Sequence, residues 1–141
     1  MVIVDANVLL YAVDRASLRH EESRNWLDRS LGGVEAVGLA WLALLAFVRV
    51  GTNAAIFPSP MSVEEALAQV EAWTHAPSGL VVEPTARHVG ILGGLLLESG
   101  TAGNLTNDAH LAALALEHGA EIVSYDRDFA RFEGVKHRLP G

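Results

Sequence analysis

Three aspartates of this sequence stand where an enzyme could use them. Asp5 directly follows the apolar run 2–4, and Asp126 lies two residues beyond the similar run 121–124. Asp108 lies early in a helical stretch, shortly after a glycine-containing loop. Carboxylates that converge repel one another unless a cation lies among them, and ligand sets made only of oxygen select Mg²⁺ or Mn²⁺. A centre of this kind supports metal-assisted hydrolysis of a phosphodiester bond.

Each of these aspartates also has an explanation that involves no catalysis. An aspartate after a strand is often a turn or cap residue, which would explain Asp126, and Asp108 would stabilise the start of its helix by about 0.3–1 kcal/mol. Asp5 is harder to explain in this way, because it lies between Val4 and Val8, where a buried acid needs a partner or a metal. The presence of all three acids at equivalent places favours one shared metal site.

The elements that must position these acids alternate between strands and helices. Short apolar runs predict strands at residues 2–4, 80–82 and 121–124, with a weaker candidate at 34–39. Helices are predicted over residues 7–13, 20–31, 40–52, 84–99 and 107–118, with another after Ser62 and a helical turn at 127–132. Because a helix separates each strand from the next, we expect an α/β fold with a parallel sheet between helical layers. Right-handed crossovers then place the carboxyl ends of the strands at one edge, together with the acids that follow them.

Local signals predict where several helices begin and end. Asn7 is expected to cap the first helix, and Pro84 is expected to begin another. Residues 62–65, Ser-Val-Glu-Glu, form a capping box. Gly32 and Gly33 are expected to end the second helix.

The composition is that of a globular protein. The 141 residues fit a single domain over residues 1–141, and 50% hydrophobic with 19% charged residues excludes a disordered chain. The absence of cysteine excludes a disulfide framework, a thiolate nucleophile and zinc sites that contain cysteine. A net charge of −7 argues against binding nucleic acid by bulk electrostatics, although metal ions held by the acids would reverse the local sign.

The sequence predicts neither a targeting signal nor a membrane span. The N-terminus reaches an acid at its fifth residue and has no basic segment before it, unlike a signal peptide. The longest apolar run, residues 37–48, has twelve residues, whereas a membrane span needs about 20. We therefore expect a cytoplasmic protein with no membrane partner.

Four segments of the chain together resemble the PIN-domain ribonucleases, and more narrowly the VapC toxins of bacterial type II toxin–antitoxin systems. They are Val-Asp-Ala-Asn-Val-Leu-Leu-Tyr at 4–11, Phe-Val-Arg-Val-Gly-Thr-Asn at 47–53, Asn-Asp-Ala-His-Leu-Ala-Ala-Leu-Ala at 107–115 and Ser-Tyr-Asp-Arg-Asp-Phe at 124–129. Each motif alone is weak, but the four in this order are specific and extend over almost the whole chain.

The resemblance implies a three-layer α/β/α sandwich with a mainly parallel sheet and Mg²⁺-dependent endoribonuclease activity on structured cellular RNA. It also implies a cognate antitoxin as partner. Asp5, Asp108 and Asp126 fall on the acidic positions of the family and are the expected catalytic residues and metal ligands, with Mg²⁺ or Mn²⁺ as cofactor. Asn7 falls on a frequent polar neighbour of the first acid. We assign Asn7 and Arg49 to substrate binding, because the Arg49 guanidinium would contact a phosphate unless it pairs with one of the acids.

One position departs from the family pattern. In such toxins the residue before Phe-x-Arg-x-x-Thr-Asn is usually a catalytic Glu, but here it is Ala46, and residues 40–48 contain no ionisable group. The alanine is either a substitution that disables an active parent, which we favour, or a natural degeneration. In both cases we expect the chain to bind metal weakly and to be inactive or weakly active.

Two other classes of protein compete with this interpretation. A receiver-type signalling module would need a late lysine, but the single lysine, Lys136, lies beyond the last predicted element. A catalytically inactive PIN-like module that only binds an antitoxin or RNA is the alternative that Ala46 favours. The apolar helices over 20–31 and 40–50 would form a homodimer face or accept an antitoxin helix.

Overall fold

The computed structural model covers residues 1–141 and contains one five-stranded sheet, in which every neighbouring pair of strands is parallel. The strand order is β3-β2-β1-β4-β5. The strands are β1 (Val2–Val4), β2 (Val37–Ala40), β3 (Gly79–Val82), β4 (Glu121–Val123) and β5 (His137–Arg138). The helices are α1 (Ala6–Val13), α2 (His20–Leu31), α3 (Trp41–Gly51), α4 (Val63–Thr74), α5 (His88–Ser99) and α6 (Thr106–His118), with short 3₁₀ helices η1 (Gly103–Leu105) and η2 (Arg127–Arg131).

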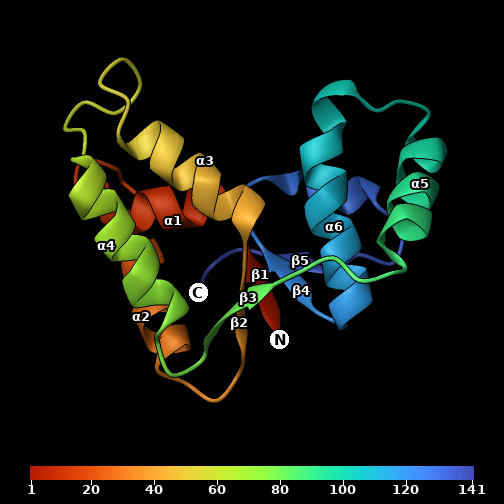
Figure 1. Ribbon diagram of the computed structural model, residues 1–141, viewed down its shortest axis with the longest axis horizontal. Helices are drawn as coiled ribbons and strands as arrows, with labels where there is room; N and C mark the ends of the chain where they lie inside the picture. The colour runs from red at the N-terminus through yellow and green to blue at the C-terminus, as the bar shows by residue number, and fades with distance from the viewer.

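Helices cover both faces of the sheet, so the predicted three-layer α/β/α sandwich is confirmed. Helices α1 to α4 lie on one side and α5 with α6 on the other (Figure 1). The alternation of side chains along β1 explains this division, because successive residues of a strand point to opposite faces. Val2 and Val4 belong to the core under α1 to α4, whereas Ile3 belongs to the core under α5 and α6.

Two helices begin directly at the carboxyl ends of central strands. Helix α1 starts two residues after Val4, and α3 starts immediately after Ala40 without a connecting loop. Leu44 and Phe47, on the inner side of α3, are completely buried, and their packing holds the helix against the sheet. Asp5 after β1 and the start of α3 after β2 therefore lie at the same edge of the sheet, as the crossover argument predicts.

Several local predictions need correction. Asn7 does not cap α1, since the Asp5 carboxylate accepts the capping hydrogen bond from the Ala6 N–H at 2.8 Å. Pro84 does not begin α5, which starts at His88, because residues 83–87 form a connection whose Thr85 N–H bonds to a carboxylate of α6.

The strand predictions differ from the structure at two places. The weak candidate at 34–39 is a real strand but is shifted to Val37–Ala40. Strand β5 was not predicted, because its two residues, His137 and Arg138, carry no apolar pattern, and only pairing with β4 defines the strand. The capping box at Ser62 is confirmed.

No helix of the structure combines the length and the apolar character that a membrane crossing requires.

Candidate active site

Asp5 is held rigidly at the end of β1. One carboxylate oxygen accepts the Ala6 N–H at 2.8 Å, and the other accepts the Ser124 hydroxyl at 2.7 Å and the Asn7 amide at 3.4 Å. Burial raises the pKa of Asp5 and outweighs these bonds, which favour the ionised form. Asp5 is partly buried, and the acid for which the sequence showed no partner has hydrogen-bond donors within the protein.

Ser124, which the sequence analysis did not single out as a site residue, connects the two central strand ends. Its fully buried hydroxyl contacts Asp5, accepts the Asp126 N–H at 2.9 Å and accepts the Asn7 amide at 3.1 Å. The Asn7 carbonyl oxygen accepts the Tyr125 N–H at 3.2 Å. Both the amide nitrogen and the carbonyl oxygen of the Asn7 side chain thus form hydrogen bonds within the protein. Its role in substrate binding stays a prediction. The one feature of the sequence that could have identified Ser124 as a site residue is its position at the end of an apolar strand.

Asp126 and Asp108 differ in how they are bonded. Asp126 caps η2, since one of its oxygens accepts the Asp128 N–H at 2.8 Å, so the cap explanation applies to it. The side chain of Asp108, in the first turn of α6, has no hydrogen bond within the protein. Burial and the charges of Asp5, Asp126 and Asp128 raise the pKa of Asp108 to about 6, although Arg131 opposes the shift. The acids therefore lie within electrostatic reach of one another.

This acidic centre fits a divalent cation in its chemistry, but it does not enclose one. Its donors are carboxylate oxygens alone, and the repulsion that raises the pKa of Asp108 is what a cation would relieve. No group of three His, Cys, Asp or Glu side chains is arranged to hold a metal ion. Mg²⁺ keeps several of its waters and needs only one or two carboxylates, so the assignment of Asp5, Asp108 and Asp126 as its ligands stays a prediction.

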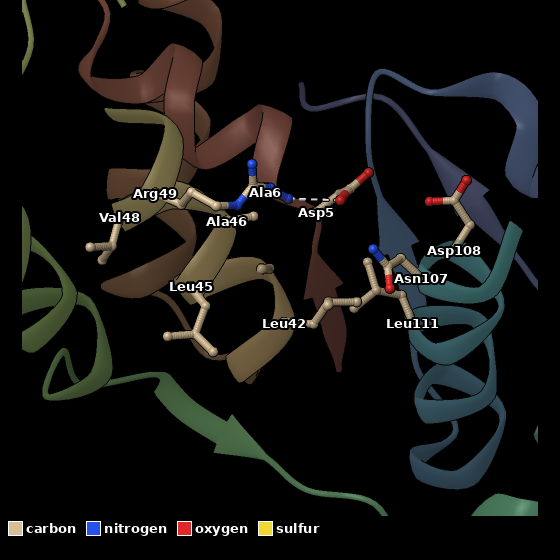
Figure 2. A pocket seen from close by; sticks show the side chains of 11 residues that line it. Asp5, Ala6, Leu42, Leu45, Ala46, Val48, Arg49, Asn107, Asp108 and Leu111 are labelled. Carbon is tan, nitrogen blue, oxygen red and sulfur yellow. Dashed lines mark hydrogen bonds between the residues drawn. The ribbon is translucent and has the colours of Figure 1, made fainter. Parts of the chain in front are cut away.

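A cavity of 630 Å³ lies between α3 and α6 and contains two of the predicted acids (Figure 2). Asp5 and Asp108 line it, and Arg49 reaches it from α3. The Arg49 guanidinium forms no ion pair with any acid, so the salt-bridge explanation for this residue is wrong. Asp126 is not among the residues that line this cavity, and its backbone N–H bonds to the Ser124 hydroxyl.

Ala46 lies on the wall of this same cavity, one turn of α3 before Arg49. The neighbouring wall residues from α3 are apolar: Leu42, Ala43, Leu45 and Val48. A carboxylate at position 46 would therefore share the cavity with Asp5 and Asp108. The position at which the sequence departs from the family pattern thus lies on the wall of the cavity that Asp5 and Asp108 line.

The fold and the site together define the class of this protein: an α/β sandwich with an acidic centre at the carboxyl edge of a parallel sheet. Residues 2–135 match the family model described as PIN domain. Ribonuclease VapC37 of Mycobacterium tuberculosis is 56% identical over 140 residues, which make up 99% of this chain and 97% of the relative. The chain therefore belongs to the PIN domain family, and within it to the VapC ribonucleases, which confirms the resemblance seen in the sequence.

Solved structures share the fold at low sequence identity. VapBC2 from Rickettsia felis, bound to a DNA fragment from its promoter, has a TM-score of 0.70 at 17% identity, covering 99% of this chain and 98% of that chain. VapC20 of Mycobacterium tuberculosis, described as a sarcin-ricin loop cleaving toxin, has a TM-score of 0.69 at 16% identity, covering 96% of this chain and 99% of that chain. These similarities establish the architecture, while the closer sequence relative carries the family assignment.

Proposed function

We propose that this chain is the toxin of a toxin–antitoxin pair and a Mg²⁺-dependent endoribonuclease that acts on structured cellular RNA. The observation that carries the proposal is the cavity in which two carboxylates, from Asp5 and Asp108, lie with the unpaired guanidinium of Arg49. The naming of the 56% identical relative as a ribonuclease supports the reaction class. An RNA substrate and an antitoxin partner place the proposed activity in the cytoplasm.

Each residue of the site has a distinct part in the proposed reaction. Asp5, Asp108 and Asp126 would hold a divalent cation, which when bound would activate a water and offset charge that develops on the phosphate. Asp5, fixed by Ser124 and the start of α1, holds the rigid side of the ion site. Asp108 has no competing hydrogen bond, so both of its oxygens are free for ligation. Arg49 binds and orients the substrate phosphate.

Ala46 should leave this chain impaired. Its methyl group supplies neither a ligand nor a charge on the wall of the cavity that Asp5 and Asp108 also line. Fewer carboxylates lower the affinity for a divalent cation, and the cleavage rate falls with the occupancy of the site.

The decisive experiment restores the carboxylate. Ala46→Glu should raise Mg²⁺-dependent RNA cleavage by at least about a hundredfold, as expected for a group that acts on the transition state. Ala46→Gln, which has the same length but no charge, is the matched control and should stay near the parental level. Cleavage is measured with mapped RNA ends, with Mg²⁺ and with EDTA. If the Glu variant is no more active than the Gln variant, the catalytic assignment of this cavity is wrong.

A module that only binds its partners is the second candidate function, and Ala46 is the observation that favours it. Titration with Mn²⁺, followed by paramagnetic relaxation, separates the two. The nuclease proposal predicts a Mn²⁺ site that Asp108→Asn weakens by about tenfold or more, because it removes a carboxylate ligand. A binding module would show no such carboxylate-dependent site.

The antitoxin is the proposed protein partner, because solved neighbours of the same fold are VapBC complexes, two of them bound to DNA. Helix α3 leaves two large apolar side chains exposed, Trp41 at 48% and Leu45 at 60%, whereas α2 buries its own. Of the two apolar helices expected to contact a partner, α2 and α3, only α3 therefore exposes an apolar face. We propose this face for antitoxin or homodimer contact.

A further inference from the structure

A second cavity of 360 Å³ lies on the other side of Asp108. The α5–α6 connection lines it with residues 101–105, and η2 contributes Arg131, with Asp128 at the start of that helix turn. Asp108 is the one residue that lines both this cavity and the larger one that contains Arg49. The two cavities therefore meet at the acid that the proposed reaction uses.

Arg131 is a cation that the fold places beside this acid and leaves unpaired. The flanking Phe129 and Phe132 are buried, and their tilted rings lie 6.3 Å apart, so η2 is anchored while Arg131 stays exposed. Arg131 forms no ion pair, and its side chain forms no hydrogen bond within the protein. An unpaired guanidinium next to several carboxylates is suited to bind an anion that approaches this centre.

The connection opposite Arg131 adds uncharged polar groups. Thr101 and Asn104 are exposed, and their side chains form no hydrogen bonds within the protein. Gly100 and Gly103 have positive φ values of 72° and 53°, which residues with a side chain rarely adopt, so they define the shape of this connection. The cavity thus offers hydroxyl, amide and guanidinium groups around a space within the lower range of small-ligand pockets.

We propose that this second cavity binds the nucleotide next to the cleaved phosphodiester, with Arg131 on its phosphate and the Thr101–Asn104 side on its sugar or base. The inference deepens the proposed ribonuclease function and rests on it. A strand that crosses Asp108 meets Arg49 in one cavity and Arg131 in the other. The chain therefore binds two successive phosphates with two unpaired arginines, despite its net charge of −7.

The alternative is that Arg131 only offsets the repulsion among the acids, and RNA binding distinguishes the two roles. The probe is a fluorescent RNA hairpin with a single-stranded loop, titrated with the Ala46 chain in Ca²⁺ at several salt concentrations. Arg131→Ala should weaken binding by about tenfold and reduce the salt slope by about 0.7–0.9, the value for one lost phosphate contact. Arg131→Lys should retain the slope, because it keeps the charge.

Arg127→Ala is the matched control. Arg127 belongs to the same helix η2, is exposed and unpaired like Arg131, but lines neither cavity. Its removal should change the RNA affinity by less than about twofold. In the Ala46→Glu background, Arg131→Ala should raise KM more than it lowers kcat, because the lost contact binds substrate away from the reacting bond.

Two results would overturn the inference. Equal effects of Arg127→Ala and Arg131→Ala on affinity and salt slope would show a general charge effect and no specific site. If Arg131→Ala keeps the parental RNA affinity, Arg131 does not bind RNA and only offsets the repulsion among the acids. Failure of the parental chain to bind any RNA, together with failure of the Ala46→Glu variant to cleave any, is a different outcome, since it refutes the proposed function itself and the inference with it.

Discussion

Ser124 shows how one uncharged side chain organises an acidic site. Its hydroxyl bonds to the Asp5 carboxylate and to the Asp126 N–H, so it couples the ends of β1 and β4. Asp5 is therefore fixed by hydrogen bonds before any ligand arrives, whereas the Asp108 side chain has no hydrogen bond within the protein, and nearby acids raise its pKa. This difference between two acids of one site determines how each responds to pH and to metal.

At the residue scale, Asp108→Asn should stabilise the metal-free protein. The folded pKa of Asp108, about 6, lies above its ordinary value of 3.8, so the folded state binds the proton more tightly than the unfolded chain does. Its contribution to the free energy of unfolding therefore falls as pH rises between these values. At pH 7 we expect Asp108→Asn to gain about 1 kcal/mol after solvent screening at this partly exposed group.

Urea denaturation in EDTA at several pH values measures this difference. The gain in the free energy of unfolding of Asp108→Asn over the parent should be near zero at pH 4 and should reach its full value at pH 7. Asp28→Asn, a change at an exposed acid of α2, is the control and should show no such rise. A gain that does not depend on pH would contradict the assigned origin of the shift.

At the scale of elements, a buried carboxylate joins α5 to α6. The Glu117 side chain has no exposed surface and accepts the Thr85 N–H at 2.8 Å, the Thr85 hydroxyl at 2.6 Å and the His88 ring N–H at 2.5 Å. Burial opposes its ionisation, but these bonds outweigh burial and lower the pKa of Glu117. The cluster holds the start of α5 against α6, the helix that carries Asp108.

Glu117→Gln should cost about 2 kcal/mol of stability at pH 7, since an amide cannot accept all three donors and leaves buried groups unpaired. Because the folded pKa lies below the ordinary 4.5, the contribution of Glu117 is present above that pH and is lost as pH falls further. The cost of the substitution should therefore shrink below pH 4.5. Urea denaturation measures it, with the exposed Glu98→Gln in α5 as control, and equal costs for both variants would refute the anchor.

Two glycines should respond in opposite directions to the same substitution. A methyl group on Gly79 would collide with the Trp73 carbonyl, at the passage from α4 to β3, so Gly79→Ala should destabilise the protein by about 3 kcal/mol. A methyl group on Gly90, inside α5, meets nothing within 4 Å, and Gly90→Ala should stabilise the protein by about 0.5–1 kcal/mol. Thermal denaturation distinguishes them, and two shifts of the same sign would contradict the packing described.

At the scale of the whole molecule, the charge balance sets how RNA can be approached. The chain has 17 Asp and Glu against 10 Lys and Arg, and several of the acids surround the proposed catalytic centre. An acidic centre repels a polyanion until cations bind to it. The two unpaired arginines, Arg49 in the larger cavity and Arg131 beside Asp108, act only over a short range, because salt screens charges beyond about 8–10 Å.

RNA affinity should therefore depend on divalent cations. In Ca²⁺ the Ala46 chain should bind an RNA hairpin about three- to tenfold more tightly than in EDTA at equal ionic strength, because cations at the acids cancel the repulsion. Asp108→Asn should remove most of this difference, and a substitution of the exposed Asp28 should retain it. Fluorescence anisotropy measures the affinities, and equal binding with Ca²⁺ and EDTA would contradict a cation site.

The sequence by itself determined the layered α/β fold, the order of the motifs and the positions of the three candidate acids. Each of these rests on a local pattern of residues. Three apolar residues before Asp5 and the run before Asp126 define strands whose ends must share an edge. Strand β5 and the start of α5 were not predicted correctly. Pairing with β4 defines the strand, and the hydrogen bonds of Glu117 fix where the helix begins. These are contacts between residues distant in sequence.

Only the tertiary structure decided how the acidic residues and their neighbours are arranged and bonded. It showed that Ser124 orders the strand ends, that Arg49 is unpaired, and that Ala46 shares a cavity with Asp5 and Asp108. Residue types and spacing indicate which groups could act, but hydrogen bonds and burial, which depend on three-dimensional packing, determine which of them are free to act.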